Sequence, residues 1–244
     1  MPSTLLLWDI DGTLLHTDGA GMRAMARVGA ALYGEAFSWA GIEASGQLDP
    51  FIFEQALSNN GLVASAGAHR EFHELYIGEL EAELERFAHR CQPMPGIDAV
   101  LRHLCDRRRA RGDVTQGLLT GNYARAAELK LRASGIDPGW FELGVFGDEG
   151  PTRPDLVALA LRRFTALAGT PVAPENVVVI GDTPRDVACA HAHGCIALAV
   201  ATGRYGIDAL LDAGADVAVR DLSDPAPLLA IIDRRATTPG APRS

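Results

Sequence analysis

Lysine is almost absent from this chain. Of its 22 basic residues only Lys130 is a lysine, and the others are arginines. Because 31 residues are acidic, the formal net charge is −9, whereas proteins that bind nucleic acid usually present strongly basic faces. The charge balance therefore argues against nucleic acid or another polyanion as a partner. A single lysine also makes any mechanism that requires a lysine easy to test.

Cysteine is scarce too, and the sequence has no long hydrophobic run. The cysteines form no CxxC pair and no metal-ligand spacing; they are Cys91, Cys105, Cys189 and Cys195. Free thiols in a reducing cytosol are the simplest interpretation. No apolar stretch approaches the roughly 20 residues of a membrane span, and the amino-terminal segment lacks the pattern of a signal peptide. We therefore expect a soluble, cytoplasmic protein that does not act on a membrane.

What the chain does have is a large apolar fraction, 48% of 244 residues, which is enough for one large domain or two modest ones. Short apolar runs predict buried strands at 4–8, 115–119, 143–146, 177–180, 196–200 and 217–219. Helical patterns separate most of them, at 97–110, 124–134, 155–167, 187–193 and 207–213. Strands that alternate with helices indicate an α/β fold with a central parallel sheet covered on both faces.

Residues 16–95 interrupt this alternation. Three amphipathic helical patterns occur there without a strand between them, at 22–32, 50–58 and 69–89. We therefore expect a core built from residues 1–15 and 96–233, with an all-helical insert at 16–95. The last segment, 234–244, contains prolines and no apolar periodicity, which predicts a disordered tail.

The hexapeptide Asp-Ile-Asp-Gly-Thr-Leu at residues 9–14 directly follows the first predicted strand. Strand alternation would point Asp9 and Asp11 to opposite faces, unless the backbone already bends at Asp11. Two carboxylates this close repel each other, so the arrangement is tolerable only if a cation or a shared proton neutralises them. The alternative is a polar strand end followed by a turn. The complete string favours catalysis.

Polar groups also follow the other predicted strands. Ligands bind at the carboxyl ends of the strands in an open parallel sheet. The second strand ends at Thr120, Gly121 and Asn122, whose hydroxyl and helix-leading amides suit a phosphate. The fourth is followed by Asp182 and Asp186, which lie four residues apart and can approach one Mg²⁺. Alone, each residue could be an ordinary helix cap or helix-start acid, but together at one edge they favour phosphate and metal.

Three segments resemble motifs of a known family. Residues 9–13, 119–122 and 181–186 look like motifs I, II and IV of the haloacid dehalogenase (HAD) superfamily. The resemblance implies a Rossmann-like core and makes the insert a mobile helical cap of the C1 type. By position it implies that Asp9 is the nucleophile that becomes an aspartyl-phosphate and that Asp11 is the general acid and base. It implies phosphate binding by Thr120 with Gly121 and Asn122, and a Mg²⁺ site formed by Asp9, the Asp11 backbone carbonyl, Asp182 and Asp186.

Motif III departs from the family pattern, which expects a basic residue that is usually lysine. Arg153 occupies that place, and Lys130 is its rival. Arg153 leaves the third strand at the active edge, whereas Lys130 lies about two turns into its helix, on the order of 10 Å from the strand edge. We therefore assign the phosphate-clamping role to Arg153. The alternative for Lys130 is a solvated residue on a helix face.

The side chains also limit the reaction. Asp11 argues against a dehalogenase, and the absence of lysine from residues 16–95 argues against a phosphonatase and weakens a sugar phosphomutase. The expectation is Mg²⁺-dependent hydrolysis of a small organic phosphate monoester, similar to phosphoglycolate phosphatases. The alternatives are another HAD reaction (phosphomutase or dehalogenase) and, from a different class, a non-catalytic receiver-like phospho-acceptor.

The insert must supply selectivity for the substrate, which we expect to be a small phosphorylated metabolite. Gly46 and Gln47 lie on a predicted loop that faces the site, and Arg23 is a candidate contact for a substrate carboxylate. The alternative for Arg23 is a solvated helix arginine. For the assembly, the sequence is compatible with a monomer or a homodimer.

Overall fold

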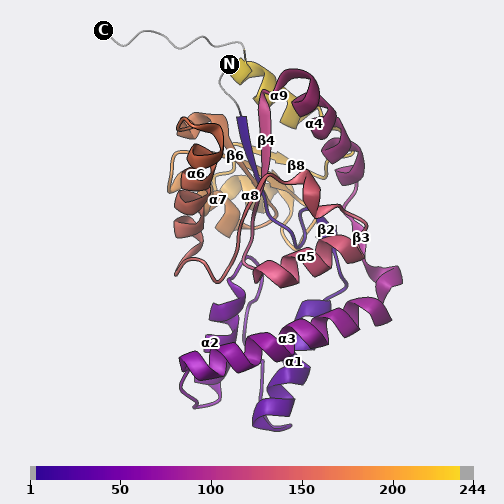
Figure 1. The fold of residues 1–244 in the computed structure, drawn as a ribbon, viewed down its shortest axis with the longest axis vertical. Helices are drawn as coiled ribbons and strands as arrows, with labels where there is room; N and C mark the ends of the chain where they lie inside the picture. Colours follow the sequence, from indigo (N-terminus) through magenta and orange to yellow (C-terminus); the bar gives the residue numbers. More distant parts are fainter. Residues whose placement is uncertain (1–3, 237–244) are drawn as a thin grey trace.

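The centre of the protein is a six-stranded parallel sheet (Figure 1). The structure is a computed structural model that describes residues 4–236. In spatial order the strands are β5 (Leu143–Val145), β4 (Val114–Leu119), β1 (Thr4–Trp8), β6 (Val177–Gly181), β7 (Ile196–Val200) and β8 (Val217–Val219). The predicted α/β class with a central parallel sheet is confirmed.

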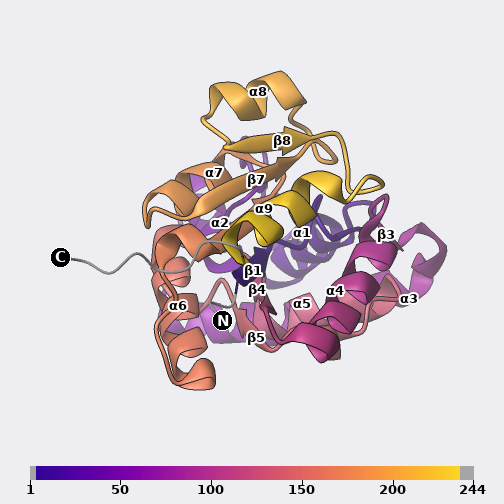
Figure 2. The same cartoon turned by 90° about the horizontal axis from the view of Figure 1, so that it is seen from above.

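Helices cover both faces of this sheet (Figure 2). One face carries α4 (Ile97–Arg111) and α9 (Ala226–Ala236), and the other carries α6 (Arg153–Ala168), α7 (Pro184–His191) and α8 (Ile207–Asp212). Strand alternation divides β1 between the two cores, because Leu6 and Trp8 pack with α4 and α9 while Leu5 and Leu7 pack with α6 and α7. None of the helices within residues 4–236 combines the length and apolar character needed to cross a membrane.

The expectation of a disordered tail at 234–244 is wrong for its first residues, which lie in helix α9. The helix runs to Ala236, so it enters the segment expected to be a disordered tail. Leu228, Ile231 and Ile232 of this helix belong to the core, which supplies the burial that holds it. The remainder of that segment, 237–244, lies outside the described residues.

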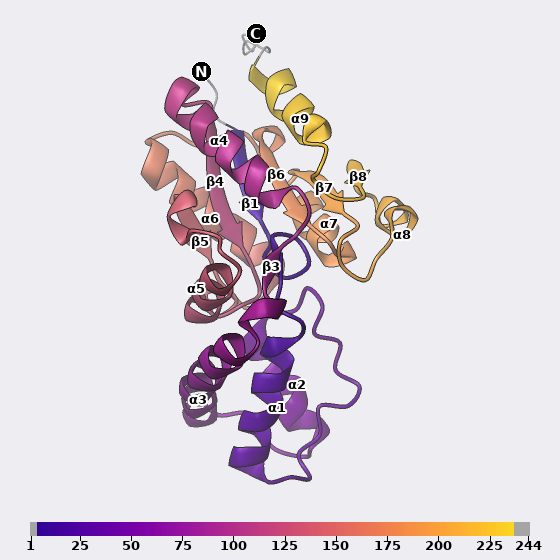
Figure 3. The ribbon, with the colours of Figure 1, turned by 90° about the vertical axis from the view of Figure 1, so that its right-hand side faces the viewer.

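The helical insert forms a separate layer beyond the carboxyl ends of the strands (Figure 3). It contains α1 (Ala20–Tyr33), α2 (Asp49–Asn59) and α3 (Ala66–Arg86), which share a core around Phe53, Phe72 and Leu80. The chain leaves the sheet through β2 (Leu15–His16) and returns through β3 (Gln92–Pro93), and these two short strands pair antiparallel. Single-turn 3-10 helices complete the fold: η1 (Ala88–Arg90), η2 (Pro138–Trp140) and η3 (Pro174–Asn176).

Helix α5 (Ala124–Ala133) lies between the insert and the sheet (Figures 1 and 3). Its Ala127 and Leu131 pack into the core beside the sheet, while Ala126 and Leu129 pack with the helices of the insert. The helix therefore runs across the carboxyl ends of the strands instead of returning along the sheet. Residues well inside α5 consequently stay close to those ends.

The strand order places β1 where the winding of the chain reverses. From β1 the chain adds β4 and β5 on one side, and it then crosses to add β6, β7 and β8 on the other. In open α/β sheets the crevice at such a reversal is the usual ligand site. The segment after Trp8 lies at this position.

Candidate active site

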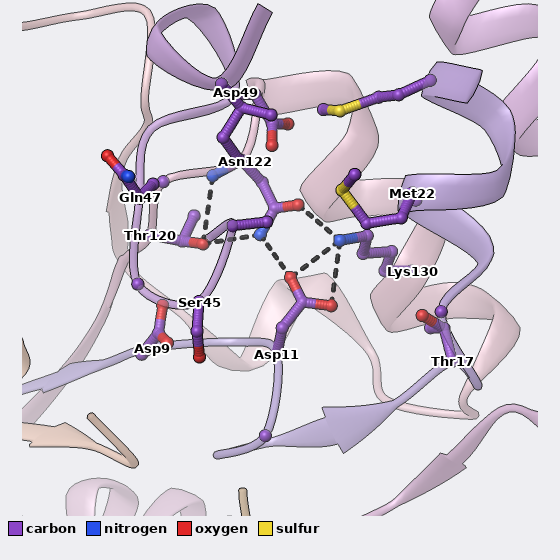
Figure 4. Close-up of a pocket in the computed structure, with 18 of the residues that line it drawn as sticks. Asp9, Asp11, Thr17, Met22, Ser45, Gln47, Asp49, Thr120, Asn122 and Lys130 are labelled. Carbon is purple, nitrogen blue, oxygen red and sulfur yellow. Dashed lines mark hydrogen bonds and ion pairs between the residues drawn. The ribbon is translucent and has the colours of Figure 1, made fainter. Parts of the chain in front are cut away.

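The two acids of the first motif line the same cavity because the chain turns between them. The Asp9 amide still donates to the Ile180 carbonyl at 2.9 Å, as a continuation of β1 would. The amides of Thr13 and Leu14 then both donate to the Ile10 carbonyl, which closes a tight turn with Gly12 at φ +80°. Strand alternation therefore ends at Asp9, and both carboxylates face a cavity of about 310 Å³ (Figure 4).

Three buried carboxylates converge beside this turn. Ligand oxygens of Asp9, Asp182 and Asp186 all lie within 4.8 Å of one another. Burial raises the pKa of Asp9 to about 7, and burial together with the Asp9 and Asp186 charges raises that of Asp182 to about 8. One arginine, Arg153, opposes the rise at both acids. The cluster thus holds more negative charge than its surroundings neutralise, and its hard oxygen donors fit a divalent cation such as Mg²⁺.

Glycine is required around Asp182. A Cβ atom at Gly203 would lie 1.7 Å from Asp182 Oδ2, and one at Gly12 would lie 2.5 Å from the same oxygen. Any larger residue at either position would displace the carboxylate. The two glycines therefore hold space for Asp182 next to Asp9.

Asp186 both caps a helix and belongs to the cluster. Its Oδ2 accepts from the Thr183 amide at 3.0 Å, and the Thr183 hydroxyl accepts from the Asp186 amide, which completes a capping box at the start of α7. Its Oδ1 accepts from Arg153. The ordinary role of a helix-start acid and a place in the acidic cluster are thus combined in one side chain.

Arg153 is the buried cation of the acidic cluster. It begins α6, is 7% exposed, and places Nη2 2.9 Å from Asp9 Oδ1 while also pairing with Asp186. Burial alone would lower its pKa, but the Asp186 and Asp9 carboxylates raise the pKa of Arg153 above its ordinary value. It therefore stays charged beside Asp9, and its Nη1 also donates to the Gly46 carbonyl of the insert at 3.2 Å.

Lys130 lies at the site, contrary to the expected distance from the strand edge. Its Nζ donates to both carboxylate oxygens of Asp11, at 2.9 and 2.7 Å, and to Asn122 Oδ1 at 2.6 Å (Figure 4). The side chain is 5% exposed, so a solvated helix-face residue is excluded. The expectation was wrong because it assumed a helix that runs away from the sheet edge, whereas α5 crosses that edge. Burial raises the pKa of Asp11, but Lys130 and Asn122 outweigh it and lower that pKa overall.

The second motif forms the neighbouring wall. Asn122 Nδ2 donates to Thr120 Oγ1 at 2.7 Å and to Asp11 Oδ2 at 2.8 Å, so one amide links the hydroxyl to the acid. The insert approaches closely here, since a Cβ at Gly121 would lie 1.9 Å from the Gln47 carbonyl oxygen. The Asp49 amide donates to the Gly121 carbonyl at 2.8 Å. The residues predicted to bind phosphate therefore come together under a loop of the insert.

The residues predicted to face the substrate are only partly brought together. Gly46 and Gln47 line the cavity, but Arg23 does not. The Arg23 guanidinium is bound to Glu83 at 2.7 Å and to the Asp18 carbonyl. Both partners belong to the insert, so Arg23 links parts of the insert to one another, and its buried Nη2 has no hydrogen-bond partner among the described residues.

Two residues of the cavity, Asp49 and Tyr76, were given no chemical role by the sequence analysis. Asp49 begins α2, is buried, and accepts from the Tyr123 amide at 3.0 Å; burial raises its pKa to about 7. Tyr76 lies in the middle of α3. Asp49 before Pro50 has the pattern of an ordinary helix start, and Tyr76 on an amphipathic helix has the pattern of core packing. Neither pattern carries a signal that separates these residues from structural ones.

Comparison with known proteins agrees with this geometry. The family model for haloacid dehalogenase-like hydrolases matches residues 6–191. No curated protein sequence matches the chain. Similar solved structures include CbbY from Rhodobacter sphaeroides in complex with phosphate (21% identity, TM-score 0.70, 96% of this chain and 100% of that one). A hydrolase from Pseudomonas syringae is also similar, with 20% identity, a TM-score of 0.67, and coverage of 93% of this chain and 98% of that one. The same holds for a predicted phosphoglycolate phosphatase from Haemophilus somnus, with 16% identity, a TM-score of 0.66, and coverage of 93% of this chain and 98% of that one. At these identities the structural likeness shows the fold.

Proposed function

This chain belongs to the haloacid dehalogenase-like hydrolases, and we propose that it hydrolyses a small organic phosphate monoester with the help of Mg²⁺. One observation carries the proposal. The acidic cluster of Asp9, Asp182 and Asp186 adjoins a separate group in which Asp11 is bound by Lys130 and Asn122. The two acids of one motif thus occupy different environments, as a nucleophile and a proton carrier require.

Asp9 is the proposed nucleophile. Mg²⁺ held by Asp9, Asp182 and the Asp11 backbone carbonyl, with Asp186 as a further ligand, would neutralise the cluster and the phosphoryl charge. Arg153 orients the Asp9 carboxylate through the 2.9 Å contact with Oδ1. Attack by an Asp9 oxygen on phosphorus forms an aspartyl-phosphate as the ester oxygen leaves. The hydroxyl of Thr120 and the amides of Gly121 and Asn122 are the proposed donors to the phosphoryl oxygens.

Asp11 is the proposed proton carrier. It gives a proton to the departing ester oxygen, and it takes a proton from the water that attacks the aspartyl-phosphate and releases phosphate. Its side chain is 46% exposed, so substrate and water can reach it from the cavity. The contacts from Lys130 and Asn122 that lower the pKa of Asp11 keep it ionised, which is the form that can take a proton from water.

The same residues favour hydrolysis over the alternative reactions. Proton transfer to an oxygen leaving group gives Asp11 a role that a dehalogenase does not require. The insert contains no lysine, which weakens both phosphonatase and sugar phosphomutase reactions. A receiver-like phospho-acceptor would need no insert of this size over its carboxylates.

Phosphate release by the purified protein tests the proposal. With Mg²⁺ we expect hydrolysis of p-nitrophenyl phosphate and of at least one member of a phosphometabolite panel, and EDTA should abolish it. Asp9→Asn should lower kcat by a factor of about 10³ or more. Asp212→Asn, which changes an exposed acid on α8, is the matched control and should retain full activity. Failure of the wild-type protein on every substrate would refute the proposal.

A further inference from the structure

The part of the cavity wall that the insert supplies contains no lysine or arginine among its described residues. Its functional groups are of other kinds, namely the hydroxyls of Thr17, Ser45 and Tyr76, the amide of Gln47, the carboxylate of Asp49, the imidazole of His16, and the thioethers of Met22 and Met25. Figure 4 shows Asp49, Met22 and Gln47 around the space above Asp11 and Lys130. A substrate's leaving group would contact this wall once its phosphoryl group lies at Asp9.

The basic groups on the core side are already engaged. An ammonium group has three donors, and those of Lys130 match the two Asp11 oxygens and Asn122 Oδ1. Arg153 lies at the phosphoryl end, against Asp9 and Asp186. The remaining nitrogen base of the lining is His16, which is half exposed and lies 4.0 Å from Asp18. A second anionic group on the substrate would therefore find no uncommitted lysine or arginine in the described lining.

The Tyr76 hydroxyl is a buried group without a partner. The side chain is 0% exposed, and its oxygen has no hydrogen-bond partner among the described residues, although the residue lines the cavity. An unsatisfied buried hydroxyl costs about 1–3 kcal/mol, which a ligand hydroxyl can offset. Gly21 lies next to both groups, since a Cβ there would be in contact with the Tyr76 oxygen and with Lys130 Nζ, each at 3.4 Å.

Asp49 supplies an acceptor in the same region. Its Oδ2 is bound to the Tyr123 amide at 3.0 Å, and its other oxygen has no partner within residues 4–236. A phenol that donates or accepts, together with a carboxylate that accepts, is suited to two hydroxyl groups on one small molecule. The cavity of about 310 Å³ is small for a ligand site, which limits that molecule to a few carbons or one sugar ring.

We propose that the substrate is the phosphate ester of a small neutral polyol, whose hydroxyls bind Tyr76 and Asp49, and that esters carrying a second anionic group are rejected. The inference rests on the proposed phosphatase function and specifies its substrate class. It differs from a phosphoglycolate-like specificity, which would require a cation facing the substrate carboxylate.

Three esters of similar size test the substrate class. The value of kcat/KM for glycerol 3-phosphate should exceed that for 2-phosphoglycolate by at least roughly tenfold, equivalent to about 1.4 kcal/mol. Ethanolamine phosphate tests the alternative that Asp49 binds a cation. If 2-phosphoglycolate is hydrolysed as well as glycerol 3-phosphate, or if ethanolamine phosphate is preferred by tenfold, the inference is overturned.

Variants of the insert wall connect the preference to named residues. Tyr76→Phe should lower the ratio of kcat/KM for glycerol 3-phosphate to that for p-nitrophenyl phosphate by about tenfold, because the second compound offers no hydroxyl. Tyr33→Phe, in the insert but outside the cavity lining, should leave the ratio unchanged. Met22→Lys should raise activity on 2-phosphoglycolate relative to glycerol 3-phosphate by at least about tenfold.

Two kinds of failure can be distinguished. If p-nitrophenyl phosphate is not hydrolysed at all, the phosphatase function fails and the substrate class fails with it. If it is hydrolysed but Tyr76→Phe slows both substrates equally and Met22→Lys does not change the preference, only the substrate class is refuted.

Discussion

Asp182→Asn should make the metal-free protein more stable while abolishing its activity. The Asp182 side chain is 3% exposed, and burial with the charges of Asp9 and Asp186 raises its pKa to about 8. Asparagine has nearly the same shape without the charge, and Thr13 Oγ1 can still donate to its Oδ1 as it does to Asp182 at 3.4 Å. The variant thus removes a repulsion and keeps the packing.

The expected gain follows from the pKa of Asp182. One pKa unit corresponds to about 1.4 kcal/mol, so a rise from 3.8 to about 8 sets an upper bound of roughly 6 kcal/mol. Because Asp9 and Asp186 share the repulsion and can shift once it is relieved, we expect about 2–4 kcal/mol. An acid whose folded-state pKa is raised destabilises the fold increasingly as pH rises from 3.8 and reaches its full effect above about 8. The gain in the free energy of unfolding of the variant over wild type should therefore be largest at pH 8.5, and at pH 5.5 it should be less than about half of that value.

Urea unfolding in EDTA at these two pH values measures the effect. Asp212→Asn is the matched control, and should change the free energy of unfolding by less than about 0.5 kcal/mol. Added Mg²⁺ should stabilise the wild-type protein more than the variant, because binding to the folded state adds to its stability. A variant that is less stable than wild type at pH 8.5 in EDTA, or equally stabilised at both pH values, would refute the reasoning.

Three further predictions concern other parts of the molecule. Arg153→Ala should lower kcat/KM for p-nitrophenyl phosphate by about 10³, and Lys130→Ala by about 10–100; the reverse order would transfer the motif III role to Lys130. Gly121→Ala should lower kcat/KM at least about tenfold because its Cβ would lie 1.9 Å from the Gln47 carbonyl oxygen, with circular dichroism as the check on folding. Asp113→Asn breaks a buried pair with Arg107 and should cost about 2–4 kcal/mol at pH 7 in urea unfolding, without loss of activity. Since hydrogen bonds from Arg107 lower the pKa of Asp113 below 3.8, this difference should shrink as pH falls below that value.

Much of the core was predictable because its signals are local. Runs such as 5–8 and 177–180 are apolar at every position, as expected for strands buried on both faces, and they lie in β1 and β6. The ribbon of β2 and β3 carries no such signal, because each strand has two residues and its partner lies far along the chain. Helix α9 was missed for a related reason. Its apolar residues are buried in the core that they share with α4 and β1, and those elements lie far away in the sequence.

The site was predictable where the chemistry lies in one short segment. Asp9 and Asp182 follow strands directly, so strand direction alone brings them to one edge, and Asp11 lies in the turn that begins after Asp9. The position of Lys130 depends on the path of α5 across that edge, which no periodicity encodes. Tyr76 comes from an element of the insert, and only the packing of the insert on the core brings it to the cavity. Side-chain positions that depend only on the local sequence could thus be predicted. Those that depend on how the insert and α5 pack on the sheet could not.

The ribbon of β2 and β3 also bears on how a chain of this kind can diverge. Leu15 lies opposite Pro93, so residues 16–92 leave and rejoin the core at neighbouring points, about 5 Å apart as in any strand pair. For the sheet, the whole insert is equivalent to a hairpin loop, and its length does not affect the register of the six strands. A different segment with ends at that spacing can be exchanged there while Asp9 and Asp182 stay in place. The insert can therefore change without altering the register of the sheet, but a replacement must still fit against Gly121 and Arg153, which the present insert contacts through Asp49 and Gly46.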